Sequence, residues 1–183
     1  PPASLEYRLA SGGPWRPVPV ESRDFVDPKL ANDHRVKRYE AVFAGLDPGV
    51  EYEYRILQEG APVYQARFMT APKDDSFSFI YMGDAQNGLE EWGDLLQSAF
   101  ARHREAAFYV IAGDLVDHGD YRDDWDLFFH SAARVFDRRP LVPAVGNHEL
   151  ANGGRADMYR EFFVLPRNGP DSVAPERAYS FEY

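Results

Sequence analysis

The feature that most constrains the fold is an alternation of apolar runs and helical patterns in the second half of the chain. The runs are "FSFIYM", "AAFYVI" and "PLVPAV", at residues 77–82, 106–111 and 140–145. Continuous apolar runs of this length are typical of strands buried on both faces. Between them, residues 89–103 and 121–136 carry apolar side chains at helical spacing. The alternation predicts a parallel sheet built through right-handed crossovers.

Each apolar run leads to a Gly, after Ala112 in the second run, and then to a residue with a side-chain oxygen. The three strand ends read "MGDAQ", "AGDLVD" and "VGNHE", which place Asp84, Asp114 and Asn147 in equivalent positions, with His148 beside the last. Because the carboxyl ends of parallel strands share one edge of a sheet, we expect these side chains to converge there. Taken alone, any one such end is also typical of a turn or a helix N-cap.

Convergent carboxylate and amide oxygens predict a cation site. Carboxylates that are buried without partners are costly, and a divalent ion removes that cost. Two carboxylates, an amide oxygen and an imidazole suit Mn, Fe, Zn, Mg or Ca.

The first 72 residues follow a different pattern, in which short segments alternate with a period of two. In "EYEYRI", Tyr52, Tyr54 and Ile56 fall on one face and Glu51, Glu53 and Arg55 on the other. Tyr39, Ala41 and Phe43 are expected to line one face of the preceding strand. This pattern predicts an antiparallel β-sandwich whose sheet has one solvent-facing side.

Part of this region resembles a fibronectin type III domain. In "GLDPGVEYEYRI" and the later "FMTAP", Leu46, Pro48, Gly49 and Tyr52 match that family's turn into a strand with a tyrosine corner. We therefore expect a fibronectin type III-like β-sandwich over residues 1–72, a polar linker in "TAPKDDS", and a second domain over residues 76–183.

Composition limits the partners. The net charge of −10 and a pI near 4.9 argue against nucleic acid or an anionic membrane as the main partner. A phosphorylated substrate remains compatible if metal ions supply positive charge. Cysteine is absent, which excludes disulfides and thiolate ligands. No apolar run approaches the roughly 18 residues of a membrane span, so none is predicted.

In order and spacing, "GDAQ", "GDLVD" and "GNHE" resemble the calcineurin-like metallophosphoesterases. With the fibronectin-like module in front, the chain is similar to the purple acid phosphatase branch. The resemblance implies a two-metal phosphoester hydrolase using Fe, Mn or Zn, acting on a phosphorylated small molecule or protein, and secreted or periplasmic. It implies that Asp84 binds the first metal, that Asp114 bridges both and that Asn147 binds the second. His148 is then the catalytic proton donor, and Asn147 beside it is the second expected catalytic residue.

Two positions depart from the family pattern. Gln86 stands where the family usually has His, and Asp117 stands where purple acid phosphatases have their metal-binding Tyr. The purple tyrosinate is therefore not expected, and the first metal is held through Gln86, Asp117 or water. Alternatively, Gln86 is a loop hydrogen-bonding residue and Asp117 caps a turn or helix. His118 follows closely and is a candidate substrate contact, with a surface role as the alternative.

The family's later His and Gly-His-x-His motifs are absent, since no His follows His148. We therefore expect only the first half of the α/β phosphoesterase sandwich, half of a metal site, and little or no turnover by this piece alone. Two alternatives stay open: a non-catalytic binding or structural protein with a degenerate phosphoesterase domain, and a phosphodiesterase instead of a monoesterase.

Overall fold

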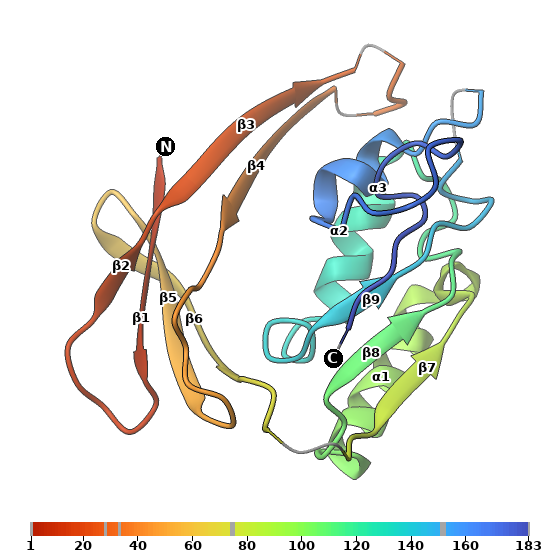
Figure 1. The fold of residues 1–183 in the computed structure, drawn as a ribbon. Coiled ribbons are helices and arrows are strands. Elements are labelled where there is room, and N and C mark those ends of the chain that lie inside the picture. Colours follow the sequence, from red (N-terminus) through yellow and green to blue (C-terminus); the bar gives the residue numbers. More distant parts are fainter. Residues whose placement is uncertain (1, 28, 33, 74–75, 151–152, 183) are drawn as a thin grey trace.

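The N-terminal region consists of a four-stranded antiparallel sheet and a long hairpin (Figure 1). The computed structural model describes residues 2–27, 29–32, 34–73, 76–150 and 153–182. The sheet has the order β2-β1-β5-β6, and the hairpin pairs β3 with β4. The strands are β1 (Ala3–Leu9), β2 (Arg16–Val18), β3 (Val20–Val26), β4 (Arg35–Ala41), β5 (Glu51–Gln58) and β6 (Ala61–Met69).

The prediction of antiparallel strands in this region is confirmed. β4, which carries Tyr39 and Ala41, pairs with β3, whereas the partners of β5 are β1 and β6. Tyr52 accepts a hydrogen bond on its hydroxyl from the Asp47 N–H at 2.9 Å, the arrangement expected of a tyrosine corner. The fibronectin type III-like sandwich and its boundaries stay a prediction.

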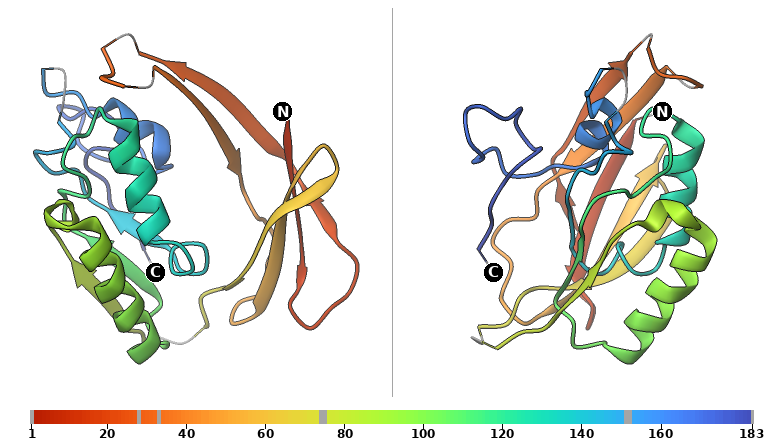
Figure 2. Two further views of the ribbon diagram at one scale, coloured as in Figure 1. Left: turned by 180° about the vertical axis from the view of Figure 1, so that it is seen from behind. Right: turned by 90° about the vertical axis from the view of Figure 1, so that its right-hand side faces the viewer.

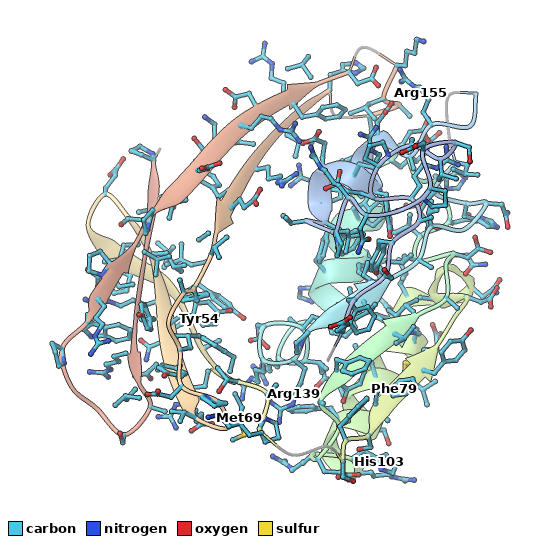
Figure 3. All side chains as sticks on the ribbon, in the orientation of Figure 1. Tyr54, Met69, Phe79, His103, Arg139 and Arg155 are labelled. Carbon is cyan, nitrogen blue, oxygen red and sulfur yellow. The ribbon has the colours of Figure 1, made fainter. Side chains whose placement is uncertain are left out.

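The two faces of β5 differ less in burial than the alternation suggested. Glu53, expected on the solvent side, is only 6% exposed because the Arg8 guanidinium and the Gln65 amide cover it, at 2.9 and 2.6 Å from its carboxylate oxygens. On the other face, Tyr54 points toward the second half of the chain and donates a hydrogen bond to the Asp137 carbonyl at 3.2 Å (Figure 3).

The second half is a three-stranded parallel sheet with helical crossovers, as predicted. The strands β7 (Phe79–Met82), β8 (Phe108–Ile111) and β9 (Leu141–Pro143) lie in the order β7-β8-β9. The helical elements are η1 (Ala85–Asn87), α1 (Leu89–Arg102), α2 (Arg122–Ser131) and α3 (Asp157–Phe162). α1 and α2 lie on the same face of the sheet (Figure 2). Among the described residues, no helix combines the length and apolarity needed to cross a membrane.

The core lies between this sheet and its helices. Trp92 of α1 stacks on Phe128 of α2 with ring centroids 5.1 Å apart, and Trp125 and Leu96 are fully buried. The expected helix over 121–136 is longer than the observed one, since α2 ends at Ser131 and turns follow. Ala132 and Val135 are nevertheless buried. Turns can bury the same side chains as a helix does, so apolar spacing alone misplaced the helix end.

β7 is not buried on both faces, contrary to the prediction. Phe79 is 48% exposed and Tyr81 is 67% exposed, on the face away from α1 (Figure 3 labels Phe79). In the described part of the chain, aromatic cover on this face comes from Phe108, which stacks on Phe79 at 5.1 Å, and from Phe181, which meets Phe108 edge-on. An apolar run marks a strand suited to burial, but whether something covers it depends on the rest of the fold.

Candidate active site at the strand ends

The three strand ends lie side by side at one edge of the parallel sheet. Met82 is in register with Ile111, and Ile111 with Pro143. Asp84, Asp114 and Asn147 follow these residues by two, three and four positions. Hydrogen bonds join the first two ends directly: the Asp84 N–H donates to the Gly113 carbonyl at 3.3 Å, and the Gln86 N–H to the Asp114 carbonyl at 3.2 Å. The structure therefore places the predicted residues together at one edge.

The backbone at both aspartates is unusual. Asp84 has φ 55° and Asp114 has φ 53°, in the left-handed region. Residues other than Gly seldom adopt this conformation, although Asp tolerates it better than most, and such strain is concentrated at functional sites. The left-handed turn after each strand ends the sheet pairing and begins the loop that carries the candidate site.

Gly146 is the close-contact point between the second and third strand ends. A Cβ at this position would lie 2.1 Å from the Asp114 Oδ1 atom and 2.3 Å from its backbone nitrogen. Any other residue would therefore displace Asp114. This contact explains why a Gly precedes the Asn-His pair.

Glu149 holds the second and third strand ends together, and the sequence patterns gave it no role. Its carboxylate is 1% exposed and accepts four backbone N–H hydrogen bonds. The donors are Gly146 at 2.7 Å, Asp114 at 3.0 Å, Leu115 at 2.7 Å and Val116 at 3.2 Å. Burial raises its pKa, against the opposing effect of these donors. Its position as the acidic residue at the end of "GNHE" is the sequence signal that could have indicated this role.

His148 is held by the loop after β8. Its backbone N–H donates to the Asp114 Oδ1 atom at 3.1 Å, and its Nδ1 atom lies 2.8 Å from the Asp117 carbonyl. Because a carbonyl only accepts, the Nδ1 atom carries the proton in this contact. The hydrogen bond to the Asp117 carbonyl, with the nearby charges of Asp114, Asp117 and Glu149, raises the pKa of His148 despite its partial burial.

Asp117 lies between two imidazoles. Its carboxylate is 3.2 Å from the Nδ1 atom of His148 and 3.4 Å from that of His118. His118 also lies 3.1 Å from the Asp124 carboxylate, and its side chain is about half exposed. His118 is thus on the rim of the candidate site, as a residue that contacts substrate would be.

Gln86 is half-buried, and its Oε1 atom is buried without a hydrogen-bond partner. Buried acceptors normally have a partner, so this oxygen has unused capacity to bind a ligand. Within the described ranges, no group of three His, Cys, Asp or Glu side chains is placed to hold a metal ion. The predicted ligand set does not require one, since it combines the carboxylates of Asp84 and Asp114 with the amides of Gln86 and Asn147.

Comparison with known proteins found relatives in sequence and a similar fold. Two uncharacterized proteins from two strains of Mycobacterium tuberculosis are each 29% identical to this chain over 185 residues, covering 90% of the chain and 35% of each relative. A purple acid phosphatase from yellow lupin (Lupinus luteus) seeds has a similar fold, with a TM-score of 0.71 at 17% identity over 91% of this chain and 36% of the lupin protein. The chain thus spans about a third of the length of the proteins it matches.

The family comparison covers the half that carries the strand ends. The model of the family described as calcineurin-like phosphoesterase matches residues 77–179, from the start of the first apolar run to the segment beyond α3. This match includes all three strand ends and the loops that follow them. The chain therefore belongs to the calcineurin-like phosphoesterase family.

Proposed function

We propose that this chain carries part of the active site of a metal-dependent phosphoester hydrolase. The observation that carries the proposal is the meeting of Asp84, Asp114 and Asn147 at one sheet edge, with His148 hydrogen-bonded to the same Asp114, in a member of a phosphoesterase family. This edge of a parallel sheet is where α/β proteins bind their ligands.

Asp84, Gln86, Asp114 and Asn147 are the residues that would hold two metal ions, with Fe, Mn or Zn as the candidates. The donor set supports this fit, because carboxylate and amide oxygens suit such ions and the unpartnered Gln86 Oε1 atom adds an acceptor. When bound, the ions would offset the negative charge of the phosphate as Lewis acids. The acidic chain otherwise offers little positive charge to a phosphate.

His148 supplies the proton for the leaving group. Its Nδ1–H is engaged by the Asp117 carbonyl, which leaves the Nε2 atom as the nitrogen that donates. The raised pKa favours the protonated form of the imidazole. Neighbouring Asn147 would assist catalysis by helping to hold a metal ion at the same edge of the sheet. His118, on the loop beside Asp117, contacts the substrate.

The chain provides only half of the site. It spans about a third of the proteins it matches, and the exposed Phe79 and Tyr81 leave one sheet face available to further chain. The 183-residue chain is therefore expected to bind metal weakly. Calorimetric titration with Mn²⁺ tests this, and micromolar binding of two ions with rapid hydrolysis would contradict it.

The main experiment measures phosphatase activity in the full-length gene product. Hydrolysis of p-nitrophenyl phosphate is expected to require Mn, Zn or Fe and to be abolished by Asp114→Asn. His148→Ala is expected to slow an alkyl phosphate by about 10²–10⁴-fold and an activated aryl phosphate much less, because only the poor leaving group needs the proton. The control is His130→Ala, an exposed histidine on α2. Equal slowing of both esters would reject the role of His148.

A non-catalytic role is the second candidate. It is favoured by Gln86, which stands in place of a family His. Absence of hydrolysis by the metal-loaded full-length protein would support it. A phosphodiesterase is distinguished by the same assay with bis-p-nitrophenyl phosphate. Secretion or periplasmic export stays a prediction that cell fractionation tests.

A further inference from the structure

The β3–β4 hairpin, residues 20–41, extends from the N-terminal sheet to the phosphoesterase half; we call it the arm (Figure 1). Its strands pair in unbroken antiparallel register from Val20 with Ala41 to Val26 with Arg35. The outer end of the arm lies near α3 and Arg155 (Figure 3). The arm is therefore not confined to the N-terminal region.

The arm is firmly attached to α3 and the segment before it. Arg23 donates to both carboxylate oxygens of Glu161, at 2.7 and 2.6 Å. Asp27, 7% exposed, forms an ion pair with Arg155 at 2.5 Å. Leu30 is 3% exposed and belongs to the apolar core that includes Trp125 of α2. These contacts fix where the tip of the arm lies.

The tip also contacts the loop that leads from the candidate site to α2. The Ala31 N–H donates to the Asp120 carbonyl at 3.3 Å, and the Asn32 Oδ1 atom accepts the Arg122 N–H at 2.8 Å. Arg122 is the first residue of α2, and Tyr121, the residue before it, makes no capping hydrogen bond with its own side chain. Asn32 thus satisfies a helix N–H that has no partner within the helix.

The start of α2 in turn holds His118. The His118 backbone N–H donates to the Asp124 carboxylate in the first turn of α2 at 2.9 Å, and the His118 ring stacks on Tyr121 with centroids 4.7 Å apart. The Tyr121 N–H donates to the His118 carbonyl at 2.9 Å. A movement of the first turn of α2 would therefore also move His118.

We propose that Asn32 is a positioning residue of the active site, acting from the N-terminal region through the first turn of α2 on His118. Asn32 does not touch the reacting atoms. Its side chain is exposed, so it contributes little to the core, and its one described contact is the Arg122 N–H. The inference rests on the proposed function, in that His118 is taken as a substrate contact.

The first test uses hydrogen exchange in the 183-residue chain. Asn32→Ala is expected to speed exchange of the amides of residues 118–124 by about three- to tenfold, as for loss of a capping hydrogen bond. Asn32→Asp keeps the acceptor oxygen and should restore protection. The matched control is Lys37→Ala, an exposed change on the same arm whose ion pair with Asp24 stays within the hairpin. Unchanged exchange in Asn32→Ala would overturn the proposal.

The second test measures kinetics in the full-length protein with p-nitrophenyl phosphate. Asn32→Ala is expected to raise KM about three- to tenfold with kcat within about twofold of wild type, and Asn32→Asp to reverse the change. An unaltered KM in an active enzyme rejects the positioning role. If wild type hydrolyses no phosphoester, the proposed function fails, while the exchange data still decide whether Asn32 controls His118.

Discussion

Glu149→Gln is the most informative single substitution, because it changes one atom at the point where the strand ends meet. The Oε1 atom accepts the N–H groups of Leu115 and Val116, and the Oε2 atom accepts those of Asp114 and Gly146. Whichever oxygen becomes an NH₂ group, two N–H donors lose their acceptor and face another donor; those on Oε1 are buried and those on Oε2 are partly buried.

The expected loss of stability follows from the two N–H donors that lose their acceptor. A buried donor left without a partner costs about 1–3 kcal/mol, so two cost about 2–6 kcal/mol of unfolding free energy. This is a large share of the roughly 5–15 kcal/mol that stabilises a typical domain. If the Oε2 position becomes the NH₂ group, the variant should also loosen the Gly146–Asn147–His148 turn, whose first N–H it then releases.

Urea unfolding followed by circular dichroism measures this loss. The control is Glu90→Gln, an exposed carboxylate in the first turn of α1 with the same change in charge, for which the loss should stay below about 1 kcal/mol. If Glu149→Gln unfolds at the same urea concentration as the control, the four N–H bonds do not hold the strand ends together, and the reasoning is wrong.

Three further predictions test other parts of the structure. Gly146→Ala should destabilise the chain by about 1–3 kcal/mol through crowding of Asp114, whereas Gly83→Ala, whose Cβ would have no neighbour closer than 3.8 Å, should cost clearly less in the same urea assay. Glu53→Gln should cost about 1.5–3 kcal/mol at pH 7. The hydrogen bond from Arg8 holds the pKa of Glu53 below its ordinary 4.5, so its stabilisation is full above that pH and is lost as pH falls through the lowered value. A difference from wild type that persisted at pH 2 would contradict this. Tyr52→Phe should cost about 1 kcal/mol by removing the acceptor of the Asp47 N–H, measured by thermal unfolding against Tyr81→Phe at an exposed site.

Sequence patterns found the parallel sheet because its signals are local. Apolar runs, helical spacing and the Gly that ends each run are properties of neighbouring residues, and the shared edge follows from parallel topology. Local patterns were less informative about element ends and neighbours. They extended α2 beyond Ser131 because turns can bury apolar side chains at the same spacing as a helix, and they did not specify that β4 pairs with β3.

The sequence by itself determined the order of the elements and the set of oxygen-bearing side chains at the strand ends, Asp84, Asp114 and Asn147. Only the tertiary structure decided what holds the strand ends, namely the buried Glu149 carboxylate and the contact of Gly146 with Asp114, and that the arm reaches α2. The physical reason is that the Glu149 carboxylate is stabilised by N–H groups that only folding brings to it. These groups lie up to 35 residues away along the chain. No pattern of adjacent residues encodes such a contact.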